Sequence, residues 1–282
     1  MAGKPASFNL LGKTMADPVF YKAPPHSVSV QGAYEPFDLQ VARGQIMGHS
    51  VVTVFGYNPD VDTSEETVWP DGGTIPHPTT ASVLKISSSS ASDTSAGTGA
   101  RTVFIEGLDG NYNVVSETVT LNGQTAVNTT NSYLYVNSFY VVTVGSGGEN
   151  AGNINAGTGT VTAGVPAVLY DIIAAGYNNR TTGHYCVPAG YTGYMVEGLF
   201  SSGQASGSTA VTGFLKQHGP DGILRVGAVA TVNNSSAVFM FQFPYAIPEK
   251  NCVGATAIGA ASNNAVSSYF NIVLIKNDLQ AA

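Results

Sequence analysis

RTVFIEGLDGNYNVVSETVTL, residues 101–121, is the stretch that decides the fold, because it contains the clearest pair of strands in the sequence. Val103 and Ile105 alternate with polar residues before a short turn, and Val119 and Leu121 do so after it. A two-residue period is typical of a β-strand and not of a helix. The turn contains Asp109-Gly110, which can supply the positive φ of a tight turn, so we predict a β-hairpin.

Similar β-prone runs recur along the rest of the chain. One covers residues 37–41, and another covers residues 51–57 and is stopped by Asn58-Pro59. Further strands are expected at residues 82–87, 133–144, 167–174, 183–187, 192–200, 210–218, 222–231, 238–243 and 267–276. No window has the period of a long amphipathic helix. We therefore predict an all-β fold of antiparallel sheets, sandwich or jelly-roll-like, as one large or two successive β modules.

Two stretches without strand character suggest how the chain is divided. Residues 1–33 have no period, and Pro18, Pro24 and Pro25 break any regular element there, so we predict an extended N-terminal arm. Residues 145–164 are nearly all Gly, Ser, Asn, Ala and Thr, and they form either a linker or an internal crossing loop. With this stretch as a boundary, we predict a first β-sandwich module at residues 34–165 and a second, jelly-roll-like module at residues 166–282.

The composition is poor in charge. Only 10% of the 282 residues are charged, against about 25% in an ordinary soluble domain, while 43% are hydrophobic and 33 are Gly. The surface must be built largely from Ser, Thr, Asn and Gly, so it resists association less than a charged surface does. This composition favours a protein that packs against copies of itself or a partner shell; the alternative is a charge-poor monomeric β protein.

Charge and hydropathy exclude other classes of partner. The net charge is −7 and no Lys or Arg cluster occurs, so we expect no nucleic-acid partner. No run approaches the roughly 18 apolar residues that span a membrane, and the opening MAGKPASFNL lacks the apolar stretch of a signal peptide. We expect no membrane partner and synthesis in a cytoplasm without export by that route.

Metal-binding patterns are weak in this sequence. Cys186 and Cys252 are far apart and have no CxxC partner, so two free thiols are predicted for a reducing site of synthesis, with a disulfide as the alternative. The histidines show no HxH or HExxH spacing and are predicted to be loop or sheet residues, not ligands: His26, His49, His77, His184 and His218. Residues 60–66, DVDTSEE, could hold a hard cation such as calcium, but turn capping by Asp62 and Ser64 is the preferred interpretation.

Catalytic patterns are also absent. The sequence has no GxSxG motif, and its nearest imitation, residues 198–203, has the wrong spacing. A glycosidase needs two carboxylates across a cleft, and the candidates are Glu106, Glu117, Glu197 and Asp221, which sequence cannot pair. We therefore predict that the chain is not an enzyme, with no catalytic residues, no metal site and no cofactor.

Several short motifs resemble virion structural proteins of tailed bacteriophages, especially aquatic ones. They lie at residues 44–50, 55–59, 68–73, 105–112, 116–123 and 187–192, and the resemblance covers most of residues 40–200. It implies a β-rich, often trimeric protein on the capsid surface or in the tail, and it brings no catalytic residues with it.

The first functional hypothesis is a capsid decoration or cement protein, a homotrimer that bridges major capsid subunits in the virion. Contacts of about 1,000–2,000 Å², repeated over the lattice, would oppose the pressure of packaged DNA. The second is a tail, fibre or receptor-binding component that presents loops such as residues 201–208, or exposed aromatic rings, to a host glycan. The third is a polysaccharide-degrading hydrolase.

Overall fold

The computed structural model describes residues 35–203 and 209–279, and strands make up most of them. All of the strand pairs are antiparallel, so the prediction of an all-β fold with antiparallel sheets is confirmed. The sandwich and jelly-roll arrangements stay predictions. The predicted arm, residues 1–33, lies outside the described residues. Within residues 35–203 and 209–279, no helix has the length and hydropathy that crossing a membrane requires.

The chain divides into two compact units, Met1–Ile46 and Met47–Ala282. The described part of the first contains the helix α1 (Phe37–Ala42), so the predicted strand at residues 37–41 is wrong. Five alternating residues are too few to fix a period. Asp38 lies in the first turn, where a negative charge favours the helix, and Phe37 and Val41 have the i, i+4 spacing of one helical face.

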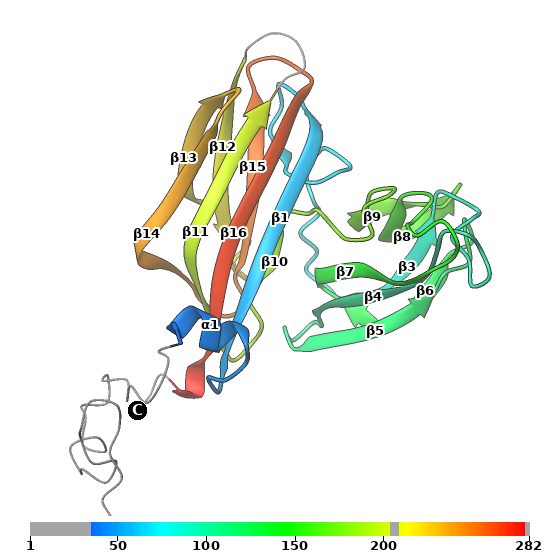
Figure 1. Cartoon of the computed structure of the whole chain (residues 1–282), viewed down its shortest axis with the longest axis horizontal. Helices are drawn as coiled ribbons and strands as arrows, with labels where there is room; N and C mark the ends of the chain where they lie inside the picture. The colour runs from blue at the N-terminus through cyan, green and yellow to red at the C-terminus, as the bar shows by residue number, and fades with distance from the viewer. Residues whose placement is uncertain (1–34, 204–208, 280–282) are drawn as a thin grey trace, which may run out of the picture. The chain divides into compact units, whose positions relative to one another are not determined.

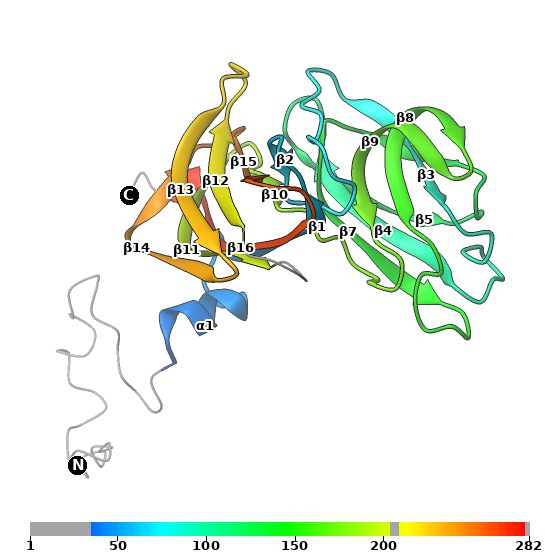
Figure 2. The ribbon, with the colours of Figure 1, turned by 90° about the horizontal axis from the view of Figure 1, so that it is seen from above.

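In the second unit, two sheets share one apolar core. The first has the order β1-β16-β11-β14 and contains β1 (His49–Val61), β11 (Tyr191–Gly203), β14 (Ser236–Ile247) and β16 (Asn264–Lys276). The second has the order β10-β15-β12-β13, with β2 paired to β15, and contains β2 (Glu66–Thr67), β10 (His184–Cys186), β12 (Ala210–His218), β13 (Arg225–Asn233) and β15 (Cys252–Gly259). Figure 2 shows the two layers edge on. Met195 and Phe270 of the first sheet meet Val211 and Val253 of the second in the core.

Two further sheets, formed by residues 82–173, share a separate core. One has the order β6-β3-β8-β9 and the other the order β5-β4-β7 (Figure 1). Leu84, Ile105, Phe139 and Ile154 are fully buried between them. Their strands are β3 (Ser82–Ser88), β4 (Ala100–Leu108), β5 (Val114–Thr120), β6 (Val127–Tyr133), β7 (Tyr135–Val144), β8 (Ile154–Thr162) and β9 (Val165–Ile173).

The predicted hairpin is present as β4 and β5, paired in one register from Leu108↔Val114 to Thr102↔Thr120. The positive φ falls on Tyr112 (+65°) and not on Gly110 as predicted. The Asp109 side chain explains this: its Oδ1 accepts hydrogen bonds from the backbone N–H of Asn111 (2.8 Å) and of Asn113 (2.9 Å). A five-residue loop capped by an Asx motif therefore replaces the tight two-residue turn.

Other strand predictions need correction. Residues 145–164 contain β8, which pairs with β3 and β9, so this stretch is not a linker. The expected strand at residues 133–144 is two strands, because β6 ends at Tyr133 and β7 begins at Tyr135. The strand β1 continues through Asn58-Pro59, with a register shift between Asn58 and Val61, and a bulge of this kind is where a strand tolerates proline. The strand β15 was not predicted at all.

The strand pairing connects distant parts of the sequence. The strand β1 pairs along its length with β16, whereas β3 to β9 pair among themselves. The division into modules at residues 34–165 and 166–282 stays a prediction; in the sheets, β8 and β9, which lie on either side of that boundary, are paired neighbours.

Candidate functional site

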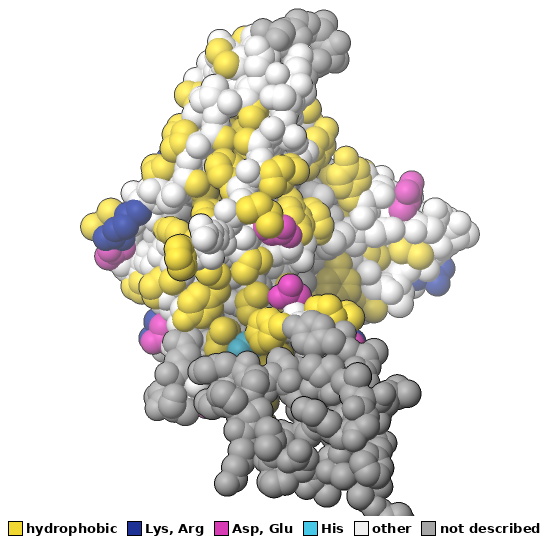
Figure 3. Space-filling view, turned by 60° about the vertical axis from the view of Figure 1, so that its left-hand side comes forward, with side chains coloured by type: hydrophobic (Ala, Val, Ile, Leu, Met, Phe, Trp, Pro, Cys, Tyr) yellow, Lys and Arg dark blue, Asp and Glu magenta, His cyan; other side chains and the backbone are white. Residues whose placement is uncertain are grey.

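The strand β14 exposes several large apolar side chains. The exposed fraction is 62% for Val238, 75% for Met240 and 84% for Phe243. We call the exposed apolar residues of β14 the apolar face; its members are Val238, Met240 and Phe243. Figure 3 shows hydrophobic side chains gathered on the side of the molecule where β13 and β14 lie.

The apolar face arises because β14 is apolar in both of its alternating positions. Phe239 and Phe241 point inward and pack against the core, while Val238 and Met240 occupy the positions between them and face solvent. A strand that is apolar on both sides is typical of a sheet covered on both faces. In the described residues of a single chain, only one face of β14 is covered.

Charge is scarce on this face. The strand β14 has no charged residue and β13 has only Arg225. Arg225 Nη2 lies 2.7 Å from Asp221 Oδ2, which lowers the pKa of Asp221. Sheet edges are usually protected from association by charged side chains, and here β13 and β14 are the end strands of their sheets. The structure therefore leaves a sheet edge that is apolar and open to association.

A second candidate surface is an aromatic groove of about 350 Å³, lined by Phe55, Tyr57, Tyr177 and Tyr269 among others. Phe55 and Tyr177 are exposed, and the rings of Phe55 and Tyr269 lie 5.3 Å apart. At its edge, Glu197 accepts a hydrogen bond from the Tyr269 hydroxyl (2.9 Å). Aromatic rings beside a carboxylate form the kind of surface on which sugar rings stack.

The candidate catalytic carboxylates are not brought together. Glu117 is opposite Ile105 in the β4–β5 register and Glu106 is opposite Ser116, so these two carboxylates lie on opposite faces of one sheet. Glu117 accepts hydrogen bonds from the backbone N–H of residues 130 and 131. Glu197 lies on β11 and Asp221 in the turn before β13, so each belongs to a different sheet or turn. Burial raises the pKa of Glu106.

The acidic loop at residues 60–66 is held by protein donors. Glu66 is buried and accepts hydrogen bonds from the side-chain amide of Asn58 (2.9 Å) and the backbone N–H of Gly73 (3.2 Å). Glu65 lies 2.5 Å from Lys216 Nζ and accepts a hydrogen bond from the Thr256 hydroxyl (2.6 Å). These two carboxylates therefore fix the loop against β15 and β12.

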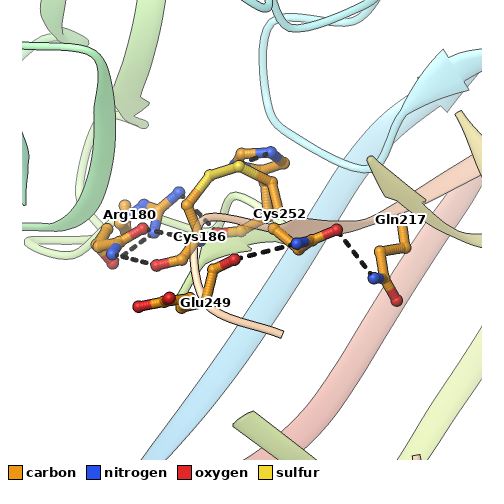
Figure 4. The surroundings of a disulfide bond; sticks show 8 residues. Arg180, Cys186, Gln217, Glu249 and Cys252 are labelled. Atoms are coloured by element: carbon orange, nitrogen blue, oxygen red, sulfur yellow. Dashed lines mark hydrogen bonds between the residues drawn. A yellow bond between two sulfur atoms is a disulfide. The ribbon is translucent and has the colours of Figure 1, made fainter. Parts of the chain in front are cut away.

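Cys186 and Cys252 form a disulfide, so the prediction of two free thiols is wrong (Figure 4). They lie directly opposite each other in the β10–β15 register, 66 residues apart in sequence. Sequence spacing could not indicate this, because the pairing depends on the sheet. Both side chains are fully buried, together with Leu108 and Leu134.

Polar contacts around the disulfide connect β10 with β7. The side-chain amide of Asn137 donates to the Cys186 carbonyl (2.8 Å), and its oxygen accepts from the Cys186 N–H (3.0 Å). Arg180 Nε lies 2.5 Å from the buried carboxylate of Asp171. Burial raises the pKa of Asp171, and Arg180 and the Thr182 hydroxyl oppose that rise. Removing either partner of this buried pair would leave an uncompensated charge.

Three histidines that are far apart in the sequence are adjacent in the structure. The rings of His77 and His218 lie 4.2 Å apart, and those of His184 and His218 lie 6.1 Å apart. Desolvation, and then the charge of His218, lowers the pKa of His77 to about 4. Desolvation also lowers the pKa of His184 and of His218. Of the other two, His49 begins β1 and His26 lies outside the described residues.

Comparisons with known proteins give little guidance. No protein-family model and no curated protein sequence matches this chain. Among solved structures, the VP2 subviral particle of infectious bursal disease virus is 10% identical over 81% of this chain and 72% of that chain, with a TM-score of 0.21. The Gt strain of the same virus is 12% identical over 86% of this chain and 78% of that chain, with a TM-score of 0.18. Superpositions this poor carry no argument about fold or function.

Proposed function

We propose that this chain is a non-enzymatic structural protein of a virus particle, which works by packing against copies of itself and against neighbouring virion proteins. The observation that carries the proposal is the apolar face. Large apolar side chains that are exposed together on one strand mark sites of association. The charge-poor composition, 10% charged residues, supports the same interpretation.

We propose that the apolar face binds a second copy of the chain. Met240 and Phe243 have no charged neighbour on β14, so identical faces meet without the repulsion that like charges would cause. In a homotrimer, the three copies of this face would converge on the threefold axis, and each copy would also contact a different surface of the next. This assembly would cover the second side of β14.

The particular role that we propose is decoration of a tailed-bacteriophage capsid. The resemblance of short motifs to virion proteins of such phages supports it, as at residues 105–112 and 187–192. In this role the homotrimer is made in the host cytoplasm, joins the virion and bridges major capsid subunits. Its many small contacts add up over the lattice and hold the shell against internal pressure.

The aromatic groove favours a second candidate, a tail or receptor-binding component. Phe55 and Tyr177 reach solvent and could stack on a host-surface glycan, while Glu197 orients the Tyr269 ring by accepting a hydrogen bond from its hydroxyl. Binding to a glycan array that Tyr177→Ala abolishes would support this candidate. Binding that the variant leaves unchanged, or no binding by the wild-type chain, would exclude it.

Copy number in purified particles tests the proposal. Quantitative mass spectrometry should find hundreds of copies per particle if the chain decorates the shell, and a few to a few dozen if it belongs to the tail. A chain that is absent from purified particles would overturn both virion roles. Phe243→Asp should lower the copy number of a shell protein, because it places a charge in the contact.

A further inference from the structure

His77, His184 and His218 come from three separate elements and meet in one place. His77 lies in the loop between β2 and β3, His184 begins β10, and His218 ends β12. One ring nitrogen from each lies within 4.8 Å of the others. Histidine is the commonest metal ligand, and it binds through a neutral ring nitrogen.

The hydrogen bonding leaves ring nitrogens available. His218 Nε2 is buried and makes no hydrogen bond within the described residues. His184 is buried, and its Nε2 is 3.9 Å from Cys186 Sγ, a long contact in which the disulfide sulfur can only accept, so the neutral tautomer protonated at Nδ1 leaves Nε2 without a partner there. Burying an imidazole nitrogen without a partner is costly, so a buried nitrogen of this kind calls for a ligand.

We propose that His77, His184 and His218 bind one divalent transition-metal ion through three imidazole nitrogens, with Zn²⁺ as the best-fitting ion. Zn²⁺ binds imidazole nitrogen at about 2.0–2.1 Å, which places tetrahedral ligand atoms roughly 3.4 Å apart. The nitrogens must approach slightly from their present separation. His77 can make this movement because it is exposed and lies outside the strands.

The surroundings fit a site with an open fourth position. A pocket of about 250 Å³ adjoins His77 and His218 and is lined by Tyr112 and Tyr135. Water from this pocket would complete the tetrahedron. Three nitrogen ligands favour Zn²⁺, Ni²⁺ or Cu²⁺ over Ca²⁺ and Mg²⁺, which prefer oxygen. Cys186 and Cys252 also lie near His184, but their sulfurs are bonded to each other and so are not ligands.

Two cationic side chains lie near the histidines, and each is paired with a carboxylate. Arg180 donates through Nη2 to the His184 carbonyl (3.3 Å) and pairs with Asp171, although, after the larger effect of desolvation, its charge still contributes to lowering the pKa of His184. Lys216, which lines the same pocket as the three histidines, pairs with Glu65. A bound ion would tie the loop that carries His77 to β10 and β12, so metal should stabilise the folded chain.

The test uses the full-length chain without a polyhistidine tag and without thiol reductant. Titration with Zn²⁺ against a chromophoric chelator should give one ion per chain, and Co²⁺ should give the visible absorption of a tetrahedral complex. His77→Ala should weaken Zn²⁺ binding by at least the roughly 10–100-fold that even an outer-shell change costs. The midpoint of thermal unfolding should rise with Zn²⁺ in the wild-type chain and not in this variant.

The matched control is His49→Ala, which removes a histidine outside the cluster and should bind Zn²⁺ as the wild-type chain does. His218→Ala provides a second variant, in which the tetrahedral Co²⁺ spectrum should disappear. The proposal is overturned if the wild-type chain binds no Zn²⁺, or if His77→Ala and His218→Ala both bind it as tightly as the wild-type chain. Because His77 lies in an exposed loop, its replacement leaves the core intact.

Discussion

The sheets formed by residues 82–173 and the β13–β14 edge differ in where their large apolar side chains lie. In the first region, Ile105 and Phe139 are fully buried, and the exposed apolar residues are five valines and one tyrosine spread over four strands, each 52% exposed or less. On β14, Val238 and Met240 face water as a continuous row, while Phe239 and Phe241 fill the core behind them. The first region is complete within one chain, whereas the second has a face that a neighbour can cover.

The comparison predicts that the core of residues 82–173 is the most sensitive part of the molecule. Phe139→Ala should destabilise the protein by about 3–5 kcal/mol, because it leaves a cavity between two sheets. Urea denaturation followed by fluorescence of Trp69, which packs against Ile172 of β9, measures this. Val168→Ala is the control at an exposed position and should change stability by less than about 0.5 kcal/mol. A small effect of Phe139→Ala would show that this core is not closed.

The disulfide should contribute the next largest effect. Replacing both Cys186 and Cys252 with Ala should cost about 2–4 kcal/mol, because the bond closes a 66-residue loop and constrains the unfolded chain. Chemical denaturation of the double variant against the oxidised wild-type chain gives the difference. An unchanged denaturation midpoint in the double variant would contradict the stabilising role of the disulfide. Free thiols in the purified wild-type chain would contradict the disulfide itself.

The hairpin cap should have a smaller effect. Asp109→Ala removes hydrogen bonds to the backbone N–H of Asn111 and Asn113, each with a net value of about 0.5–1.5 kcal/mol. Because the loop is exposed and the bonds are partly replaced by water, we expect a total loss of about 1 kcal/mol. Asp109→Asn keeps an acceptor at the same place and should recover most of it. Equal losses of stability in Asp109→Ala and Asp109→Asn would argue against capping of the loop by the Asp109 side chain.

The smallest effect on folding should come from the apolar face. Phe243→Asp changes a side chain that is 84% exposed, so the free energy of unfolding of the monomer should change by less than about 0.5 kcal/mol. Denaturation at low protein concentration measures this. A large loss of unfolding free energy would show that Phe243 stabilises the monomer. The apolar face would then not differ from the core of residues 82–173 in its role.

How much the sequence predicts depends on the side chains of each strand. The β4–β5 hairpin was predicted because large apolar residues alternate in it, whereas β8 and β15 were missed because they are rich in Gly, Ala and Thr, which give no clear period. The disulfide and the histidine cluster could not be predicted, since the sheets bring together residues far apart in sequence. The apolar face had a signal, the run AVFMFQF at residues 237–243, which is apolar at nearly every position.

Sedimentation of the purified full-length chain over a range of concentrations tests the central claim most directly. The account predicts a defined oligomer for the wild-type chain, a trimer in the proposed form, and a monomer for Phe243→Asp at the same concentrations. A wild-type chain that stays monomeric at the highest concentration, or an oligomer that Phe243→Asp leaves intact, would contradict it.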